Sequence, residues 1–231
     1  MRQTQNRIQD EFPVDVTIVI TNHNRAHFLD RAIRSCLDQL VFRQRLEVLV
    51  VDDGSTDDSL SILQTFENDI QIIALPNNRG VAAASNVGLG AARGRYWMRV
   101  DSDDFLNRMA VTFFSALLDE NPQYAYCYGD LYRVDDLGHK TSKTRLDCQE
   151  ALFEHGAGVM FRTEILRALG GYDERLREAE DYDLFRRLTA AGHRGFYLPL
   201  PLYRYHIHGG NVTLNGNREY YKALSNGKAH V

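Results

Sequence analysis

A short apolar run that ends abruptly in three carboxylates stands near the middle of the chain: Arg95-Tyr96-Trp97-Met98-Arg99-Val100-Asp101-Ser102-Asp103-Asp104. Open α/β sheets bind their ligands beyond the carboxyl ends of their strands, so acids at such an end indicate a site. Three clustered acids repel one another, and a folded chain tolerates them when a cation lies among them. The alternative for an isolated Asp-x-Asp is a solvated turn that caps the next helix. The rest of the chain decides between these two interpretations.

Three further strands are predicted upstream of this run. The apolar segments 16–20, 47–51 and 70–75 are typical of strands buried on both faces. Apolar residues at helical spacing follow the first two, and the Ala- and Gly-rich segment 81–93 predicts a helix packed closely on the sheet. Alternating strands and helices with short connections predict an α/β fold with a mostly parallel, doubly wound sheet.

This first half is predicted to bind a nucleotide, but not in the two best-known ways. It lacks Gly-x-Gly-x-x-Gly after its first strand, and it lacks Gly-x-x-x-x-Gly-Lys followed by Ser or Thr. The missing motifs argue against a dinucleotide-binding fold and against a P-loop ATPase.

The second half is less regular. We expect an aromatic strand at 124–134, a mobile polar loop at 139–150, and a short helix capped by Thr163. Acids at 180–183 open a further helix, where plain helix capping is the alternative to a functional role. His206 and His208 lie on one side of a predicted extended segment, which is compatible with metal binding.

Composition limits the classes of function. The 231 residues carry a net charge of −4, with 44% hydrophobic and 25% charged residues, which gives no general bias toward nucleic acid. Cys36, Cys127 and Cys148 stand in no metal-ligand spacing and are predicted to be reduced thiols, as in a cytoplasmic protein. Residues 1–13 are predicted to be a flexible leader and 214–231 a polar extension. The sequence contains no run of eighteen apolar residues, so it predicts no transmembrane segment.

Several short motifs occur together in an order that resembles the family 2 glycosyltransferases with the GT-A fold. They are Ile20-Thr21-Asn22-His23-Asn24, Asp52-Asp53-Gly54-Ser55, Asn77-Asn78-Arg79-Gly80, Ser85-Asn86-Val87-Gly88, Asp101-Ser102-Asp103-Asp104, Gly170-Gly171-Tyr172-Asp173, Glu180-Asp181-Tyr182-Asp183 and Tyr205-His206-Ile207-His208. Each motif is weak alone, but their order is specific. The resemblance covers residues 14–213 as one GT-A domain, with a nucleotide-binding half at 14–105 and an acceptor and catalytic half at 106–213.

The resemblance implies an inverting transfer from a nucleotide sugar, expected to be a UDP-sugar, with Mn²⁺ or Mg²⁺ as cofactor. It assigns Asp181 as the catalytic base. It assigns to the metal Asp103, with the adjacent Asp104 as an alternative direct ligand, and His208. The implied donor-binding residues, from the base to the ribose and diphosphate, are Thr21, His23, Asn24, Asp53, Asn78, Gly80, Asn86, Asp101 and Ser102.

The sequence also departs from the family pattern. The family often has Tyr in place of His23 and Arg in place of Ser85 and His206, so Arg79, Arg99 or Lys143 could compensate near the diphosphate. The chain has no Gln-x-x-Arg-Trp element after its last motif. We therefore expect transfer of one sugar or a few to a glycan or lipid-linked acceptor in surface glycan synthesis, with peripheral contact at the inner membrane face left open.

Two alternatives come from other classes. Haloacid-dehalogenase-like phosphatases also use Asp-x-Asp after a strand, but theirs follows the first strand, whereas here it follows the fourth and continues into Phe105. The second alternative is a non-catalytic nucleotide-sugar-binding domain or an accessory module of a larger synthase, which Ser85 keeps open. The sequence gives no indication of the oligomeric state.

Overall fold

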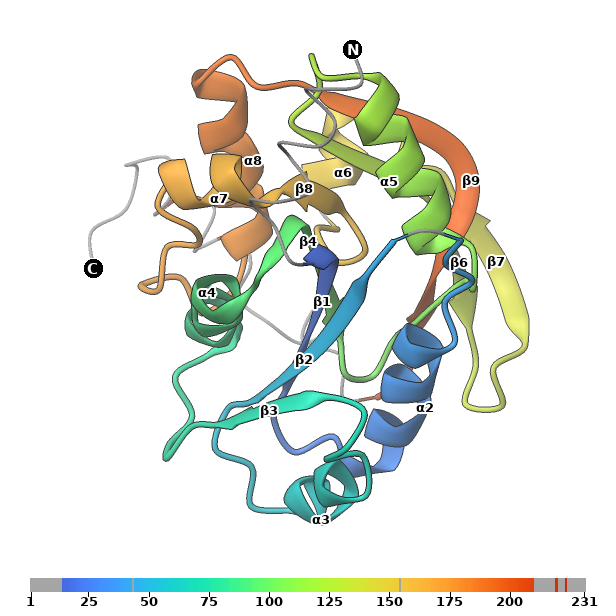
Figure 1. Ribbon diagram of the computed structural model, residues 1–231, viewed down its shortest axis with the longest axis vertical. Helices are drawn as coiled ribbons and strands as arrows, with labels where there is room; N and C mark the ends of the chain where they lie inside the picture. The colour runs from blue at the N-terminus through green and yellow to red at the C-terminus, as the bar shows by residue number, and fades with distance from the viewer. Residues whose placement is uncertain (1–13, 43, 154, 210–218, 220–222, 224–231) are drawn as a thin grey trace.

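The computed structural model describes residues 14–42, 44–153, 155–209, 219 and 223, and these fold around a nine-stranded sheet (Figure 1). The strand order is β3-β2-β1-β4-β8-β6-β9-β5, and β7 pairs with β6 beside this path. The strands are β1 (Val14–Asn22), β2 (Leu46–Asp52), β3 (Gln71–Ala74), β4 (Gly94–Asp101), β5 (Phe105–Leu106), β6 (Tyr126–Val134), β7 (Lys140–Thr144), β8 (Met160–Arg162) and β9 (Gly195–His206). The helices are α2 (Ala26–Leu37), α3 (Ser59–Gln64), α4 (Val81–Ala91), α5 (Ala110–Glu120), α6 (Gln149–Phe153), α7 (Thr163–Ala168) and α8 (Glu180–Ala190).

The first four strands pair in parallel, which confirms the predicted fold class. Because side chains alternate along a strand, β1 supplies both layers of the core. Ile18 packs in the cluster that includes α2, α3 and α5, while Val19 packs in the cluster that includes α4, α7 and α8. Helices therefore cover both faces of the sheet, as Figure 1 shows.

Helix α4 packs closely on the sheet because its residues are small. A Cβ added at Gly88 would lie 2.4 Å from Cγ1 of Val19, so this position has no room for a side chain. Ala83 and Ala84 are also buried. The prediction for this segment is confirmed.

The second half places its last strand beside the acids that follow β4. Strand β8 pairs antiparallel with β4, β6 pairs antiparallel with β8, and β9 runs parallel to β6. The short strand β5, just after Asp104, pairs with β9 so that Phe105 faces Arg204. This pairing brings the end of β9, and with it His206 and His208, to the end of β4.

The segment 139–150 differs from its prediction as a loop. It contains β7, which pairs with β6 through a bulge at Arg133 and Val134, and it leads into α6. The side chains of β7 are largely exposed, and an edge strand of this kind favours charged and polar residues. The polar composition that suggested a loop is thus that of an edge strand.

The predicted helix caps also differ in detail. Thr163 is the first residue of α7, and its hydroxyl donates to the Gly94 carbonyl instead of capping the helix. At the start of α3, the Asp57 carboxylate accepts the Ser59 N–H. The other carboxylate oxygen of Asp57 accepts the N–H of Ala26 at the start of α2, so one acid serves two helices.

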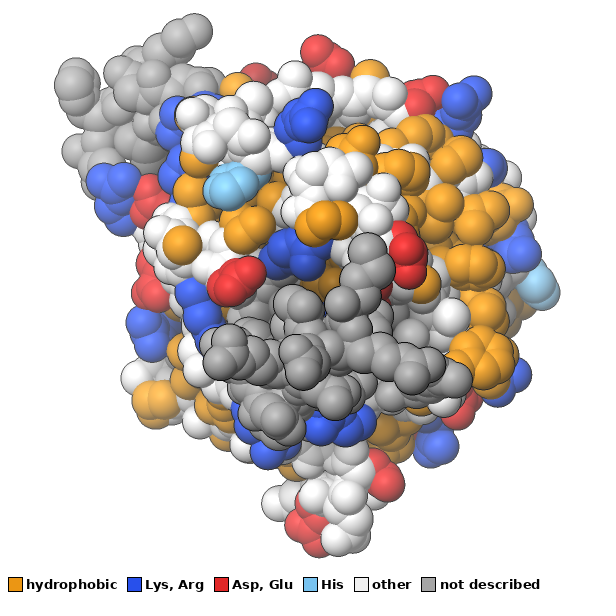
Figure 2. Space-filling view, turned by 45° about the horizontal axis from the view of Figure 1, so that its top comes forward, with side chains coloured by type: hydrophobic (Ala, Val, Ile, Leu, Met, Phe, Trp, Pro, Cys, Tyr) orange, Lys and Arg blue, Asp and Glu red, His pale blue; other side chains and the backbone are white. Residues whose placement is uncertain are grey.

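The surface carries both signs of charge. Figure 2 shows acidic and basic side chains interspersed on the face it presents, together with a gathering of hydrophobic side chains at one side. Among the large exposed hydrophobic residues are Phe42 in the loop after α2, Phe113 on α5 and Leu200 on β9. None of the helices within the described ranges is long and apolar enough to cross a bilayer. The predictions for residues 1–13 and for most of 214–231 lie outside the described residues.

Candidate active site

A cavity of about 410 Å³ lies where strands β1, β2 and β4 end and helix α8 begins. Parallel strands deliver their carboxyl ends to one edge of the sheet, which is why residues distant in sequence meet here. The lining residues are Thr21, Asn22, His23, Arg25, Asp53, Asn78, Gly80, Val81, Ala84, Arg99, Asp101, Ser102, Asp103, His155, Gly156, Ala157, Arg177, Glu178, Ala179, Glu180, Asp181 and Tyr205. We call this cavity the cleft.

Most of the predicted donor-binding residues line the cleft, but two do not. Asn24 accepts the backbone N–H groups of Thr56 and Asp57 through its side-chain oxygen, and so orders the loop before α3. Asn86 on α4 exchanges two hydrogen bonds with the backbone of Tyr172. Both amides therefore act within the fold. The predicted residues that line the cleft are Thr21, His23, Asp53, Asn78, Gly80, Asp101, Ser102, Asp103 and Asp181.

Asp53 organises one wall of the cleft. Its two carboxylate oxygens accept the backbone N–H groups of Arg79 and Gly80, at 2.8 and 2.7 Å. Gly80 adopts a positive φ of 94°, and a Cβ there would lie 2.9 Å from Nη1 of Arg177. Only glycine therefore combines this backbone conformation with the approach of Arg177. The wall is fixed by backbone contacts to Asp53, and Arg177 closes over it.

Asp103 lies in the cleft among cationic and imidazole nitrogens. Its Oδ2 is 3.0 Å from Nε2 of His208 and 3.4 Å from Nε of Arg25. Within the described ranges, no group of three or more His, Cys, Asp or Glu side chains is arranged to hold a metal ion. Mg²⁺ and similar cations in phosphate-transfer sites bind through one or two protein ligands, and phosphate oxygens complete the shell. Asp103 and His208 fit that arrangement as a pair.

Asp104, which was predicted as an alternative metal ligand, is buried outside the lining of the cleft. It is 1% exposed and does not line the cleft. Its Oδ2 accepts the Tyr203 hydroxyl at 2.7 Å, and its Oδ1 accepts the His206 N–H at 2.8 Å. Burial and the neighbouring charges of Asp103 and Asp101 raise the pKa of Asp104 well above its usual range. Asp104 thus joins β9 to the end of β4 and is directed away from Asp103 and His208, which we call the metal pair.

His206 lies next to His208 of the metal pair but approaches a carboxylate other than Asp103. Its ring is buried, and its Nε2 is 2.9 Å from Oδ1 of Asp136 in the turn after β6. The centroids of the His206 and His208 rings are 5.0 Å apart. The two histidines are therefore adjacent, as predicted, but they approach different carboxylates.

A buried arginine links the acids of β4 to those of α8. Arg99 approaches Asp101 with Nε at 3.2 Å, and it donates from Nη1 to Glu180 at 3.1 Å and from Nη2 to Asp181 at 2.9 Å. Burial, together with the negative charge of Asp181, raises the pKa of Glu180 to about 7. Oδ1 of Asp181 is buried and has no hydrogen-bond partner among the described residues. Within the described ranges, the carboxylate is thus held by a hydrogen bond to one of its two oxygens.

Sequence reasoning missed part of the cleft. Arg25, Arg177 and Glu180 line it, as do residues 155–157 before β8. Of the three cations considered for the diphosphate, only Arg99 lies in the cleft. Arg79 pairs with Glu174, and Lys143 pairs with Asp130. One signal was available for Arg99, because an arginine in an otherwise apolar strand needs acidic partners when it is buried.

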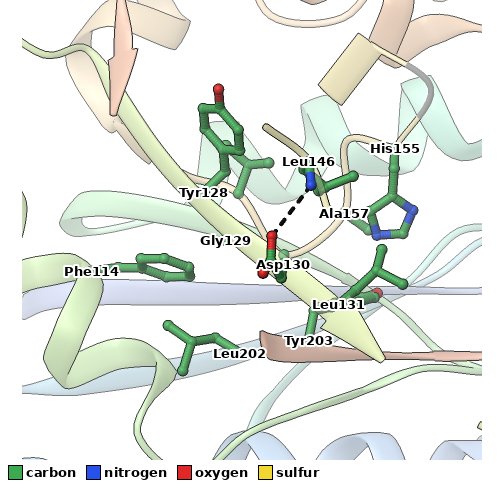
Figure 3. A pocket seen from close by; sticks show the side chains of 12 residues that line it. Phe114, Tyr128, Gly129, Asp130, Leu131, Leu146, His155, Ala157, Leu202 and Tyr203 are labelled. Atoms are coloured by element: carbon green, nitrogen blue, oxygen red, sulfur yellow. Dashed lines mark hydrogen bonds between the residues drawn. The ribbon is translucent and has the colours of Figure 1, made fainter. Parts of the chain in front are cut away.

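A second hollow lies behind the cleft, and Figure 3 shows the side chains around it. It is too small for a water molecule and shares His155 and Ala157 with the cleft. Asp130 lies on its wall, where the carboxylate accepts the Leu146 N–H and the Tyr197 hydroxyl and pairs with Lys143. Because its charge is satisfied in this way, we interpret the hollow as packing space.

Solved structures of similar fold include two that are bound to nucleotide sugars. Staphylococcus aureus TarS 1–349, in complex with UDP-GlcNAc, superposes with a TM-score of 0.77 at 20% identity, over 94% of this chain and 68% of that one. The mannosyltransferase PcManGT from Pyrobaculum calidifontis, in complex with GDP-Man and Mn²⁺, gives 0.72 at 18% identity, over 100% of this chain and 71% of that one. At these identities the likeness concerns the fold, which is that of the GT-A glycosyltransferases.

Relatives by sequence include enzymes of polysaccharide synthesis. Succinoglycan biosynthesis protein ExoO of Rhizobium meliloti is 34% identical over 88% of this chain and 64% of its own length. The chondroitin synthase of Pasteurella multocida is 29% identical over 86% of this chain and 21% of its own length, so this chain spans only part of both relatives. The profile of glycosyl transferase family 2 matches residues 17–170, and that of the glycosyltransferase-like family 2 matches residues 110–231. The chain belongs to glycosyl transferase family 2.

Proposed function

We propose that the protein transfers a sugar, with inversion, from a UDP-sugar to an acceptor hydroxyl in the synthesis of a surface glycan. The observation that carries this proposal is the state of Asp181. Its Oδ2 is fixed by Arg99, and its buried Oδ1 has no partner among the described residues. A general base needs such an oxygen within hydrogen-bond reach of the hydroxyl whose proton it removes.

The strand ends supply the donor side. Thr21, His23, Asp53, Asn78 and Gly80 line the part of the cleft that we assign to the base. Asp101 and Ser102 follow at the end of β4, where we assign the ribose and diphosphate. The UDP-GlcNAc bound in the TarS structure supports a UDP-sugar as donor, and the GDP-Man of the mannosyltransferase makes GDP the competing choice.

Asp103 and His208 are the residues that would hold a divalent cation, whose positive charge would neutralise the diphosphate as it leaves. Arg25 approaches the same oxygen of Asp103 and provides a permanent positive charge beside it. These side chains are therefore placed to favour a leaving group rich in negative charge.

Asp181 and Arg99 serve the acceptor side. The acceptor oxygen forms a bond to the anomeric carbon as the bond from that carbon to the diphosphate oxygen breaks, and UDP departs. The acceptor proton passes to Asp181 Oδ1, while the hydrogen bond from Arg99 holds Oδ2 in place. Attack from the side opposite the diphosphate gives inversion.

The relatives support a glycan or lipid-linked glycan as the acceptor, because several of them are named for polysaccharide synthesis. A lipid-linked acceptor would bring the protein to a membrane surface as a peripheral protein.

The test is a thermal-shift screen of UDP-, GDP- and dTDP-sugars with Mn²⁺, followed by measurement of nucleotide release from each binder. A ligand that binds only the folded state raises the melting temperature in proportion to its affinity. We expect a UDP-sugar to give the largest shift and to be turned over. Binding of UDP without turnover of any sugar would instead identify a nucleotide-sugar-binding module.

A further inference from the structure

Arg99 is a charged residue at the centre of a buried sheet. It lies on β4 between Met98 and Val100, both fully buried, and its own side chain is 2% exposed. Burying a guanidinium is costly unless carboxylates surround it in good geometry. Three carboxylates, from Asp101, Glu180 and Asp181, meet this need.

The three contacts are not equivalent. The two hydrogen bonds go to Glu180 and Asp181 on α8. Among the described residues, Nε of Arg99 has no hydrogen-bond partner, and it approaches Asp101 as an ion pair at 3.2 Å. The guanidinium is planar and its donors point in fixed directions, so it orients the groups it binds. Arg99 is thus bonded more specifically to α8 than to the end of its own strand.

The opposite side of the Asp181 carboxylate is equally confined. A Cβ added at Gly156 would lie 2.2 Å from both Cγ and Oδ1 of Asp181. The guanidinium carbon of Arg99 lies 5.4 Å from the centre of the Tyr172 ring, which limits its movement. The Asp181 carboxylate therefore has little freedom to turn.

We propose that Arg99 is a positioning residue for the transfer reaction, and that it acts through Asp181. By holding Oδ2, it fixes the orientation of the carboxylate, and with it the position beside Gly156 from which Oδ1 must reach the acceptor hydroxyl. This inference rests on the proposed function, in which Asp181 is the base. It differs from a direct role in binding the diphosphate, because the Nη groups of Arg99 already donate to carboxylates of α8.

The experiment is a pair of double-mutant cycles, R99Q with D181N and R99Q with D53N, measured as UDP release from UDP-GlcNAc or from whichever nucleotide sugar the wild type turns over. R99Q should lower kcat by about tenfold or more, because small misplacements of a catalytic group are costly. The donor KM should change by less than about threefold. R99Q should add little to D181N but should multiply with D53N in kcat/KM, because Asp53 bonds to the backbone of Arg79 and Gly80 rather than to Arg99.

Two further variants separate positioning from folding. R99K keeps the charge without the planar fork, so its kcat should lie between those of the wild type and R99Q. R162Q removes a partly buried arginine of β8 that bonds to backbone carbonyls away from the cleft, so it should lower stability and leave kcat unchanged.

The outcomes are distinct. Three results overturn the positioning role while the proposed function stands. R99Q could lower the kcat of D181N by the same factor by which it lowers the kcat of the wild type. It could raise the donor KM as much as it lowers kcat, or its kcat could equal that of the wild type. If the wild type turns over no nucleotide sugar, the proposed function fails and this inference fails with it.

Discussion

Two acid clusters line the same cleft, and they are held in opposite ways. At the end of β4, the side chain of Asp103 is 16% exposed, and the flexible side chain of Arg25 and the His208 ring both approach it. At the start of α8, Asp181 is confined between the rigid guanidinium of Arg99 and the backbone of Gly156. A carboxylate that must exchange partners when a cation and a diphosphate arrive needs the first arrangement. A general base, which must keep one oxygen in place, needs the second.

The largest expected effect is on the acids at the end of β4. Asp103→Asn should weaken Mn²⁺-dependent UDP binding by about 100-fold or more, since even the outer partners of metal ligands change affinity by roughly 10- to 100-fold. Calorimetry of UDP binding with and without Mn²⁺ measures this. Asp104→Asn is the matched control. It removes a carboxylate that bonds Tyr203 and His206, so it should lower stability and keep the Mn²⁺ dependence. Normal Mn²⁺ dependence in Asp103→Asn would contradict the metal assignment.

The acids at the start of α8 can be disturbed without substituting a charged residue. Gly156→Ala places a methyl group against the carboxylate of Asp181, so overpacking should cost about 1–3 kcal/mol of stability and lower kcat. Gly90→Ala is the control. Among the described residues, nothing beyond its chain neighbours and the backbone of its own helix lies within 4 Å of a Cβ there, and the helix should gain roughly 0.5–1 kcal/mol. Melting curves and nucleotide release report both effects. A fully active and stable Gly156→Ala protein would show that the carboxylate is free to move.

A smaller effect is expected from pH. The pKa of Glu180 is raised to about 7, so the folded state binds this proton more tightly than the unfolded state does. Ionisation of Glu180 therefore destabilises the fold as pH rises from about 4.5 to about 7, and the loss levels off above that. Glu180→Gln removes this dependence. Relative to the wild type, it should gain about 2 kcal/mol between pH 5 and pH 8, measured by denaturant unfolding. An identical pH dependence of the free energy of unfolding in both proteins would show that Glu180 does not bind this proton.

The first half of the fold was predictable because its signals are local. Runs such as residues 16–20 are continuous and apolar, and the small residues of α4 explain its close packing at Gly88. The second half depends on pairings that local sequence does not show. Residues 140–144 look like a loop because an edge strand exposes its side chains.

The candidate site shows the same limit. The order of motifs led to Asp103 and Asp181, which both line the cleft, but it could not separate Asp103 from Asp104. That separation depends on β9, whose Tyr203 and His206 occupy the oxygens of Asp104. Asn24 and Asn86 look like ligand-binding residues in sequence because an amide that orders a loop has the same chemistry as one that binds a ligand.

The most direct test of the account is the kinetics of Asp181→Asn. Asp183→Asn is the control, because Asp183 is a buried acid of the same helix turn that pairs with Arg186 and Arg187 and does not line the cleft. With the nucleotide sugar that the wild type turns over, Asp181→Asn should lower kcat by about 10² or more and leave the calorimetric affinity for UDP nearly unchanged. Asp183→Asn should keep kcat and lose stability. Equal losses of UDP binding and turnover in Asp181→Asn, or a kcat close to that of the wild type, would contradict the assignment of Asp181 as the base.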